Sequence, residues 1–96
     1  MPLWVYENSG VNKIKLFNEL KSSPKSVRFE RICKVIELFG FRLRGKRGSH
    51  RIYVRKGIRE MLNFQNVGGK AKPYQVKQFI KVVEKYNLLE EEDSDV

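Results

Sequence analysis

Residues 41–54 read FRLRGKRGSHRIYV, and this stretch decides the fold. Apolar and cationic side chains alternate on both sides of a Gly-Lys-Arg-Gly turn (residues 45–48), which is the period of two half-buried strands. In the second strand we expect Ile52 and Val54 to face the core, and Tyr53 to face outward. The stretch therefore predicts two antiparallel strands joined by a short turn.

Helical patterns flank these strands. Apolar side chains recur at helical spacing over residues 27–39, and Ser26 is the candidate N-cap. A Lys56-Gly57 hairpin loop leads to a third strand over residues 59–66, and a last helix begins at Pro73. The sequence thus predicts an α+β domain: helix, three-stranded antiparallel sheet, helix, with both helices on one sheet face.

Three segments differ in charge. Residues 1–24 form an amino-terminal extension that permits a short helix, with Trp4 and Phe17 available to pack on the domain. Residues 90–96 are acidic and have little to bury, so we expect a disordered tail. Of the net charge of +9, the first segment carries +1 and the last −5, so the basic domain at residues 25–89 carries +13.

So basic a domain gains free energy by binding a polyanion, of which RNA and DNA are the usual ones. The competing interpretation is a solvated surface kept soluble by lysines. No segment approaches the roughly 20 apolar residues of a membrane helix, and the start lacks a secretory-signal pattern. The single Cys33 excludes an intramolecular disulfide and suits a reducing compartment. We therefore expect a cytoplasmic protein with no membrane contact and no small-molecule cofactor.

His50 is the only histidine and the candidate catalytic residue. It opens a strand among Lys46, Arg47 and Arg51. An imidazole exchanges a proton near neutral pH, and such cations attract a phosphodiester and stabilise charge on its oxygens. A lone histidine near a strand is often only a surface residue. Alternation also places His50 with Ile52 on the presumed core face, so its exposure stays open.

A second candidate site is GGKAKP, residues 68–73, where glycines lead into a helix amino terminus that favours an anion. An ordinary loop with solvated lysines explains the same residues. The chain has no Cys/His set for zinc, scattered carboxylates and no Walker-type loop, so we expect no metal site. The predicted substrate-binding residues are Lys46, Arg47, Ser49, Arg51, Tyr53, Lys70 and Lys72.

Two stretches carry a family resemblance. Gly48-Ser49-His50, opening a strand and followed by Tyr53, resembles the motif of HicA-type (YcfA-like) toxins. So does the element order, and the run LNFQ…GGKAKPYQV within residues 62–76 is similar to one branch of that family. The resemblance covers about residues 26–89. It departs from the family at residues 64–66, where many relatives have a Pro-x-His element.

The resemblance implies a fold like that of double-stranded-RNA-binding domains, endoribonuclease activity on mRNA, a HicB antitoxin that blocks the site, and His50 as the catalytic histidine. On this basis we expect a type II toxin–antitoxin toxin in which His50 removes the proton of a ribose 2′-hydroxyl without a metal. The leading alternative is a non-catalytic module that binds double-stranded or structured RNA. A DNA-associated or interaction protein is the third class.

Overall fold

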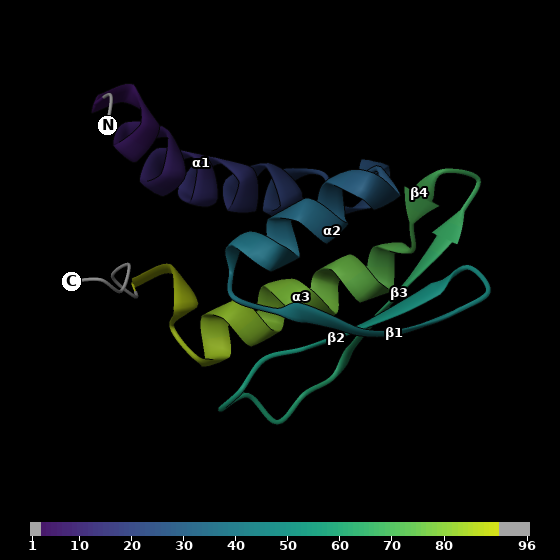
Figure 1. Ribbon diagram of the computed structural model, residues 1–96. Coiled ribbons are helices and arrows are strands. Elements are labelled where there is room, and N and C mark those ends of the chain that lie inside the picture. Colours follow the sequence, from purple (N-terminus) through teal and green to yellow (C-terminus); the bar gives the residue numbers. More distant parts are fainter. Residues whose placement is uncertain (1–2, 91–96) are drawn as a thin grey trace.

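The computed structural model describes residues 3–90, with side chains from residue 13 onward. The elements, in chain order, are α1 (Leu3–Ser22), η1 (Pro24–Ser26), α2 (Phe29–Leu38), β1 (Arg42–Arg47), β2 (His50–Val54), β3 (Leu62–Val67), β4 (Lys70–Ala71), α3 (Pro73–Lys85) and η2 (Leu88–Glu90). The strands form one antiparallel sheet in the order β1-β2-β3-β4, and α2 and α3 lie on one face of it (Figure 1). The predicted α+β class is confirmed. Of the acidic tail predicted to be disordered, residues 90–96, Glu90 instead ends η2, and the other residues lie outside the described part of the chain.

The sheet has a fourth strand that the sequence analysis missed. After Val67, a Gly68-Gly69 turn with positive φ at both residues returns the chain, and Lys70 and Ala71 pair with the end of β3. A strand of two residues is too short to show an alternation of apolar and polar side chains. The prediction of three strands is therefore corrected to four, and the order helix, sheet, helix stands.

The start of α2 also differs from the prediction. Val27 is extended, and its carbonyl accepts a hydrogen bond from the Ala71 amide at 2.9 Å, while the Phe29 amide donates to the Gly69 carbonyl at 2.9 Å. These bonds continue the sheet beyond β4 and delay the helix to Phe29. Ser26, predicted as its N-cap, instead ends the short helix η1.

Residues 55–61 connect β2 to β3, so the predicted tight hairpin at Lys56-Gly57 is wrong. Arg55 Nη1 donates to the Phe39 carbonyl at 2.7 Å and ties this loop to the end of α2. The Glu60 carboxylate accepts from Lys85 Nζ at 2.9 Å and from the Tyr86 hydroxyl at 2.8 Å. These two hydrogen bonds lower the pKa of Glu60 to about 2. The connection is long, but it is anchored to both helices.

The second half of α1 belongs to the hydrophobic core. Phe17 and Leu20 are each 1% exposed. The centroid of the Phe17 ring lies 5.9 Å from that of Phe39 and 6.4 Å from that of Phe79. Lys21 forms an ion pair with Glu84 of α3, at 2.8 Å, and Glu19 forms one with Arg31 of α2. The core therefore crosses the boundary expected at residue 24. The Trp4 side chain, offered above as a packing contact, lies outside the described side chains.

The core face of β2 is the reverse of the predicted one. Tyr53 is 1% exposed and packs edge-on against Phe64, with ring centroids 6.2 Å apart. Ile52 and Val54 are only half-buried and lie on the sheet face away from α2 and α3. The prediction fails because tyrosine is an amphipathic residue whose apolar ring can fill a core when its hydroxyl finds a partner.

Candidate active site

The β1–β2 turn fixes the position of His50. Arg47 and His50 are paired across the two strands, so Gly48 and Ser49 alone form the turn. Gly48 has a φ of +59°, which an L side chain rarely adopts, and this explains a glycine at the first position of so tight a turn. The Ser49 carbonyl accepts a hydrogen bond from the Asn66 amide at 3.0 Å, which fastens the turn to β3. The Gly-Ser-His triplet thus places the imidazole at the first position of β2.

His50 lies on the open face of the sheet, which is the face that no helix within residues 3–90 covers. Paired residues of neighbouring strands share a face, and His50 is paired with Gln65, while Tyr53 is paired with the buried Leu62. The side chain is half-buried, and its Nδ1 lies 3.1 Å from Oδ1 of Asn63. The alternation that placed His50 with Ile52 is correct, but the face they share is the open one.

Two residues that the sequence analysis did not select support this position. Gln75, in the first turn of α3, is 2% exposed, and its Oε1 accepts the Gln65 amide at 2.7 Å. This bond holds β3 at the residue opposite His50. Asn63 provides the hydrogen-bond partner of the ring. Its alternation with Leu62 and Phe64 in the sequence indicates an outward side chain, but only the pairing register shows which residue it meets.

Among the predicted substrate contacts, Arg47 and Lys70 share the face of His50. Arg47 is paired with His50 and is exposed. Lys70 is exposed and paired with Val67, which follows Gln65 by two residues in β3 and so points to the same side. Ser49 is exposed within the turn itself. The open face therefore presents one imidazole with cations on both sides of it along the sheet.

Arg51 and Tyr53 point to the other face. The Arg51 guanidinium lies 5.1 Å from the centroid of the Phe29 ring, and its Nη1 lies 3.8 Å from Sγ of Cys33. Burial raises the pKa of Tyr53 to about 12, and the hydrogen bond to Tyr53 raises the pKa of Arg51. We correct the prediction for these two residues, because their side chains pack on α2 and are directed away from His50.

The remaining two lysines of the predicted set, Lys46 and Lys72, come from β1 and from the residue before α3. Lys46 is exposed and paired with Arg51, so its side chain leaves β1 on the helix side of the sheet. Lys72 is the half-buried residue that precedes the first turn of α3, and its side chain makes no capping bond. Both add positive charge at the end of the sheet that carries the β1–β2 turn.

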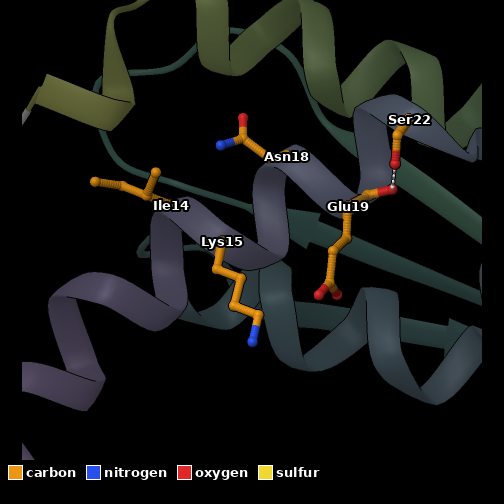
Figure 2. Close-up of a pocket in the computed structure, with 5 residues that line it drawn as sticks. All are labelled: Ile14, Lys15, Asn18, Glu19 and Ser22. Carbon is orange, nitrogen blue, oxygen red and sulfur yellow. Dashed lines mark hydrogen bonds between the residues drawn. The ribbon is translucent and has the colours of Figure 1, made fainter.

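A hollow of the described surface lies elsewhere. Its described lining residues, Ile14, Lys15, Asn18, Glu19 and Ser22, all belong to α1 (Figure 2). The Ser22 hydroxyl donates to the Glu19 carbonyl at 3.0 Å, so its polar group is used within the helix. None of the candidate site residues lines this hollow, and it forms no part of the site.

The described residues contain neither a membrane-spanning helix nor a cluster of metal ligands. No helix within residues 3–90 is long and apolar enough to cross a membrane. Nor does this part of the chain bring three or more histidine, cysteine, aspartate or glutamate side chains together as metal ligands would be.

Fold and site together define a small basic α+β protein with one histidine displayed at the start of a strand. A family model described as the HicA toxin of bacterial toxin–antitoxin systems matches residues 29–84, from the first residue of α2 almost to the end of α3. The chain belongs to the HicA toxin family, so the protein is a toxin whose class has an antitoxin as partner. No curated protein and no solved structure matches the chain. Helix α1 lies outside the matched residues.

Proposed function

We propose that this toxin is an endoribonuclease that cleaves mRNA, with His50 as its catalytic base. The observation that carries the proposal is the placement of His50 on the open sheet face, where its cross-strand neighbour is the exposed Arg47. A nucleotide approaching this face meets no covering helix among residues 3–90 (Figure 1). Family membership supports the toxin role, and the site supplies the chemistry for RNA cleavage.

The reaction needs only groups of the protein and of the RNA. The neutral imidazole takes the proton of a ribose 2′-hydroxyl, and that oxygen attacks the adjacent phosphorus. The bond to the 5′-oxygen breaks, the imidazolium or water protonates that oxygen, and a 2′,3′-cyclic phosphate remains. DNA has no 2′-hydroxyl, so the same site is inert toward it. General base catalysis of this kind contributes roughly 10²–10⁴-fold to the rate.

Cations around the imidazole position the substrate. Arg47 is the nearest candidate for the scissile phosphate, because it is paired with His50 on the same face. Ser49 in the turn and Lys70 on β4 hold flanking phosphates, while Lys46 and Lys72 attract the more distant backbone. The net charge of +9 favours binding of any polyanion and so contributes to the affinity for nucleic acid. The requirement for a 2′-hydroxyl then makes RNA, and not DNA, the substrate.

The same open face is where we place the antitoxin. A HicB-like protein that covers His50 would exclude RNA, and acidic groups on it would pair with the cations of β1. We further propose that the toxin acts in the cytoplasm, where mRNA is translated. Toxin–antitoxin family membership supports a partner of this kind.

Cleavage by purified protein tests the proposal. The protein is incubated with RNA, and with DNA of matched sequence, in excess chelator. We expect cleavage of RNA alone, 2′,3′-cyclic phosphate ends, and a loss of about 10²–10⁴-fold in His50→Ala with RNA affinity kept within twofold. The exposed Gln78→Ala on α3 is the control and should cleave normally. Full activity in His50→Ala, or loss of wild-type activity in chelator, would overturn the mechanism.

One observation favours a second function, a non-catalytic module for structured RNA. Lys70 and Lys72 directly precede α3, whose first backbone N–H groups have no side-chain cap. Such a helix start binds phosphates of an RNA duplex without any chemistry at a histidine. In that case the wild-type protein binds RNA stems without cutting them, and His50→Ala changes nothing.

A further inference from the structure

Within the described part of the chain the His50 ring has one hydrogen-bond partner, and that partner bears on which nitrogen is available to a substrate. Nδ1 lies 3.1 Å from Oδ1 of Asn63. Asn63 is paired with Ile52, two residues beyond His50, so the contact runs diagonally between β2 and β3 on the open face. In the described part of the chain, no carboxylate lies within hydrogen-bond distance of the ring.

The chemistry of an amide oxygen sets the tautomer. A carbonyl oxygen only accepts hydrogen bonds, so the 3.1 Å contact of Nδ1 with Oδ1 of Asn63 is a hydrogen bond in the tautomer that carries its proton on Nδ1. The neutral ring then has its lone pair on Nε2, on the side away from β3. We propose that Asn63 is a positioning residue that holds His50 in the Nδ1–H tautomer and presents Nε2 as the base. The kinetic part of this proposal rests on the ribonuclease function above, but the tautomer itself does not.

The residues of β3 beside His50 are held in place and carry no charge. Gln65, paired directly with His50, has its backbone amide held by Gln75, so β3 is fixed at this level. Asn63 itself is exposed and is not needed to fill the core. Arg47 on β1 and Lys70 on β4 share the open face with the imidazole, and the β3 residues Asn63 and Gln65 on that face are neutral. Asn63 therefore orients the ring without adding a charge that would retain a proton on it.

The single histidine makes the tautomer directly measurable. The ring ¹⁵N chemical shifts of labelled protein report which nitrogen carries the proton, and the spectrum contains only His50. In wild type with a neutral ring, we expect Nδ1 to carry the proton and Nε2 to be unprotonated. Asn63→Ala should give a mixture of tautomers, and Asn63→Asp should restore the Nδ1–H form, because a carboxylate also accepts from Nδ1. Asn18→Ala on α1 is the matched control and should keep the wild-type spectrum.

Kinetics supply the second readout. Asn63→Ala should lower kcat about 10–100-fold, by analogy with the loss of residues that orient metal-binding histidines, with KM within twofold. Asn63→Asp should recover activity but shift the acidic limb of the pH–rate profile to higher pH, because a carboxylate stabilises the imidazolium.

The outcomes separate this inference from the proposed function. An Nε2–H ring in wild type, or an unchanged spectrum in Asn63→Ala, overturns the role of Asn63 even when His50 is essential for cleavage. An Nδ1–H ring that changes in Asn63→Ala and returns in Asn63→Asp supports the positioning role even when the protein cuts no RNA, and the ribonuclease function alone is then lost.

Discussion

The two faces of strands β2 and β3 differ in how deeply their side chains are buried. On the covered face, Tyr53 and Phe64 are almost fully buried and pack edge-on. On the open face, the neighbouring residues His50 and Gln65 are half-buried and paired with each other. A single step along either strand thus moves from a residue that stabilises the fold to one that is available for chemistry.

The difference teaches that residue polarity alone does not assign a face. Arg51 and Tyr53 lie on the covered face because their polar ends find partners there, Phe29 and Cys33 for the guanidinium and Arg51 for the hydroxyl. Ile52 and Val54 lie on the open face, where the sheet is left uncovered. Polar groups that have partners can be buried at little cost, so a polar end does not keep a side chain out of the core.

The strongest test compares adjacent residues of β3. Phe64→Ala should lower the free energy of unfolding by about 3–5 kcal/mol, because it leaves a cavity beside Tyr53. Gln65→Ala removes a side chain from the open face and should change it by less than about 0.5 kcal/mol. Urea denaturation measures both. Similar losses in the two variants would show that the open face is packed as tightly as the covered one.

The helix layer is tested next, through α1. Leu20 is 1% exposed, so Leu20→Ala should cost about 2–5 kcal/mol, although residue 20 lies outside the family match. Ile14 is on the same helix and 50% exposed, and Ile14→Ala should cost less than about 0.5 kcal/mol. The same denaturation measurement distinguishes them. A negligible effect at Leu20 would mean that α1 is an appendage to a core complete without it.

Much of the fold was predictable from local pattern. The apolar stripe of α2, the glycine turn before His50 and Pro73 at the start of α3 are short-range signals, and each element formed where its signal lay. In α1 the apolar residues Ile14, Phe17 and Leu20 recur every three residues, and this spacing does not tell which of them are buried. A helix turns once in about 3.6 residues, so Phe17 and Leu20 reach the core, whereas Ile14 turns away from it.

The candidate site was predictable only in part, because its composition depends on register. The sequence shows that His50 opens a strand and that Arg47 precedes the turn. It does not show that Asn63 lies diagonally across from the ring, nor that Gln75 holds β3 at Gln65, because these contacts join residues separated by a long loop or by β4. Pairing between strands carries that information, and neither composition nor spacing encodes it.

Two arginines on opposite faces give a finer comparison. Arg51→Ala should cost about 1 kcal/mol of stability, because the guanidinium lies over Phe29, and should leave RNA affinity nearly unchanged. Arg47→Ala should leave stability within about 0.5 kcal/mol and reduce the salt dependence of RNA binding by about one unit of slope. Thermal unfolding and salt titrations of RNA binding measure the two effects. A loss of RNA affinity in Arg51→Ala, at constant stability, would return that residue to the binding surface.

The smallest effect concerns the loop that joins the two strands. The pKa of Glu60 is lowered to about 2, chiefly by the hydrogen bonds from Lys85 and Tyr86. A carboxyl whose pKa is depressed by folding stabilises the protein above its ordinary pKa of about 4.3, and this stabilisation is lost as pH falls toward 2. Glu60→Gln should therefore lower Tm slightly at pH 7, with the difference from wild type disappearing between about pH 5 and pH 2.

A double-mutant cycle ties that small effect to its cause. Tyr86→Phe removes the hydroxyl that donates to Glu60 at 2.8 Å, so Tyr86→Phe and Glu60→Gln should lower Tm by less together than the sum of their separate effects. Salt should weaken the contribution of the Lys85–Glu60 contact to Tm more than that of the Tyr86–Glu60 contact. Only the contact with Lys85 joins two charges at the surface. A Tm difference that persists unchanged at pH 2 would mean that Glu60 holds the loop through packing, and that the connection between β2 and β3 does not depend on its charge.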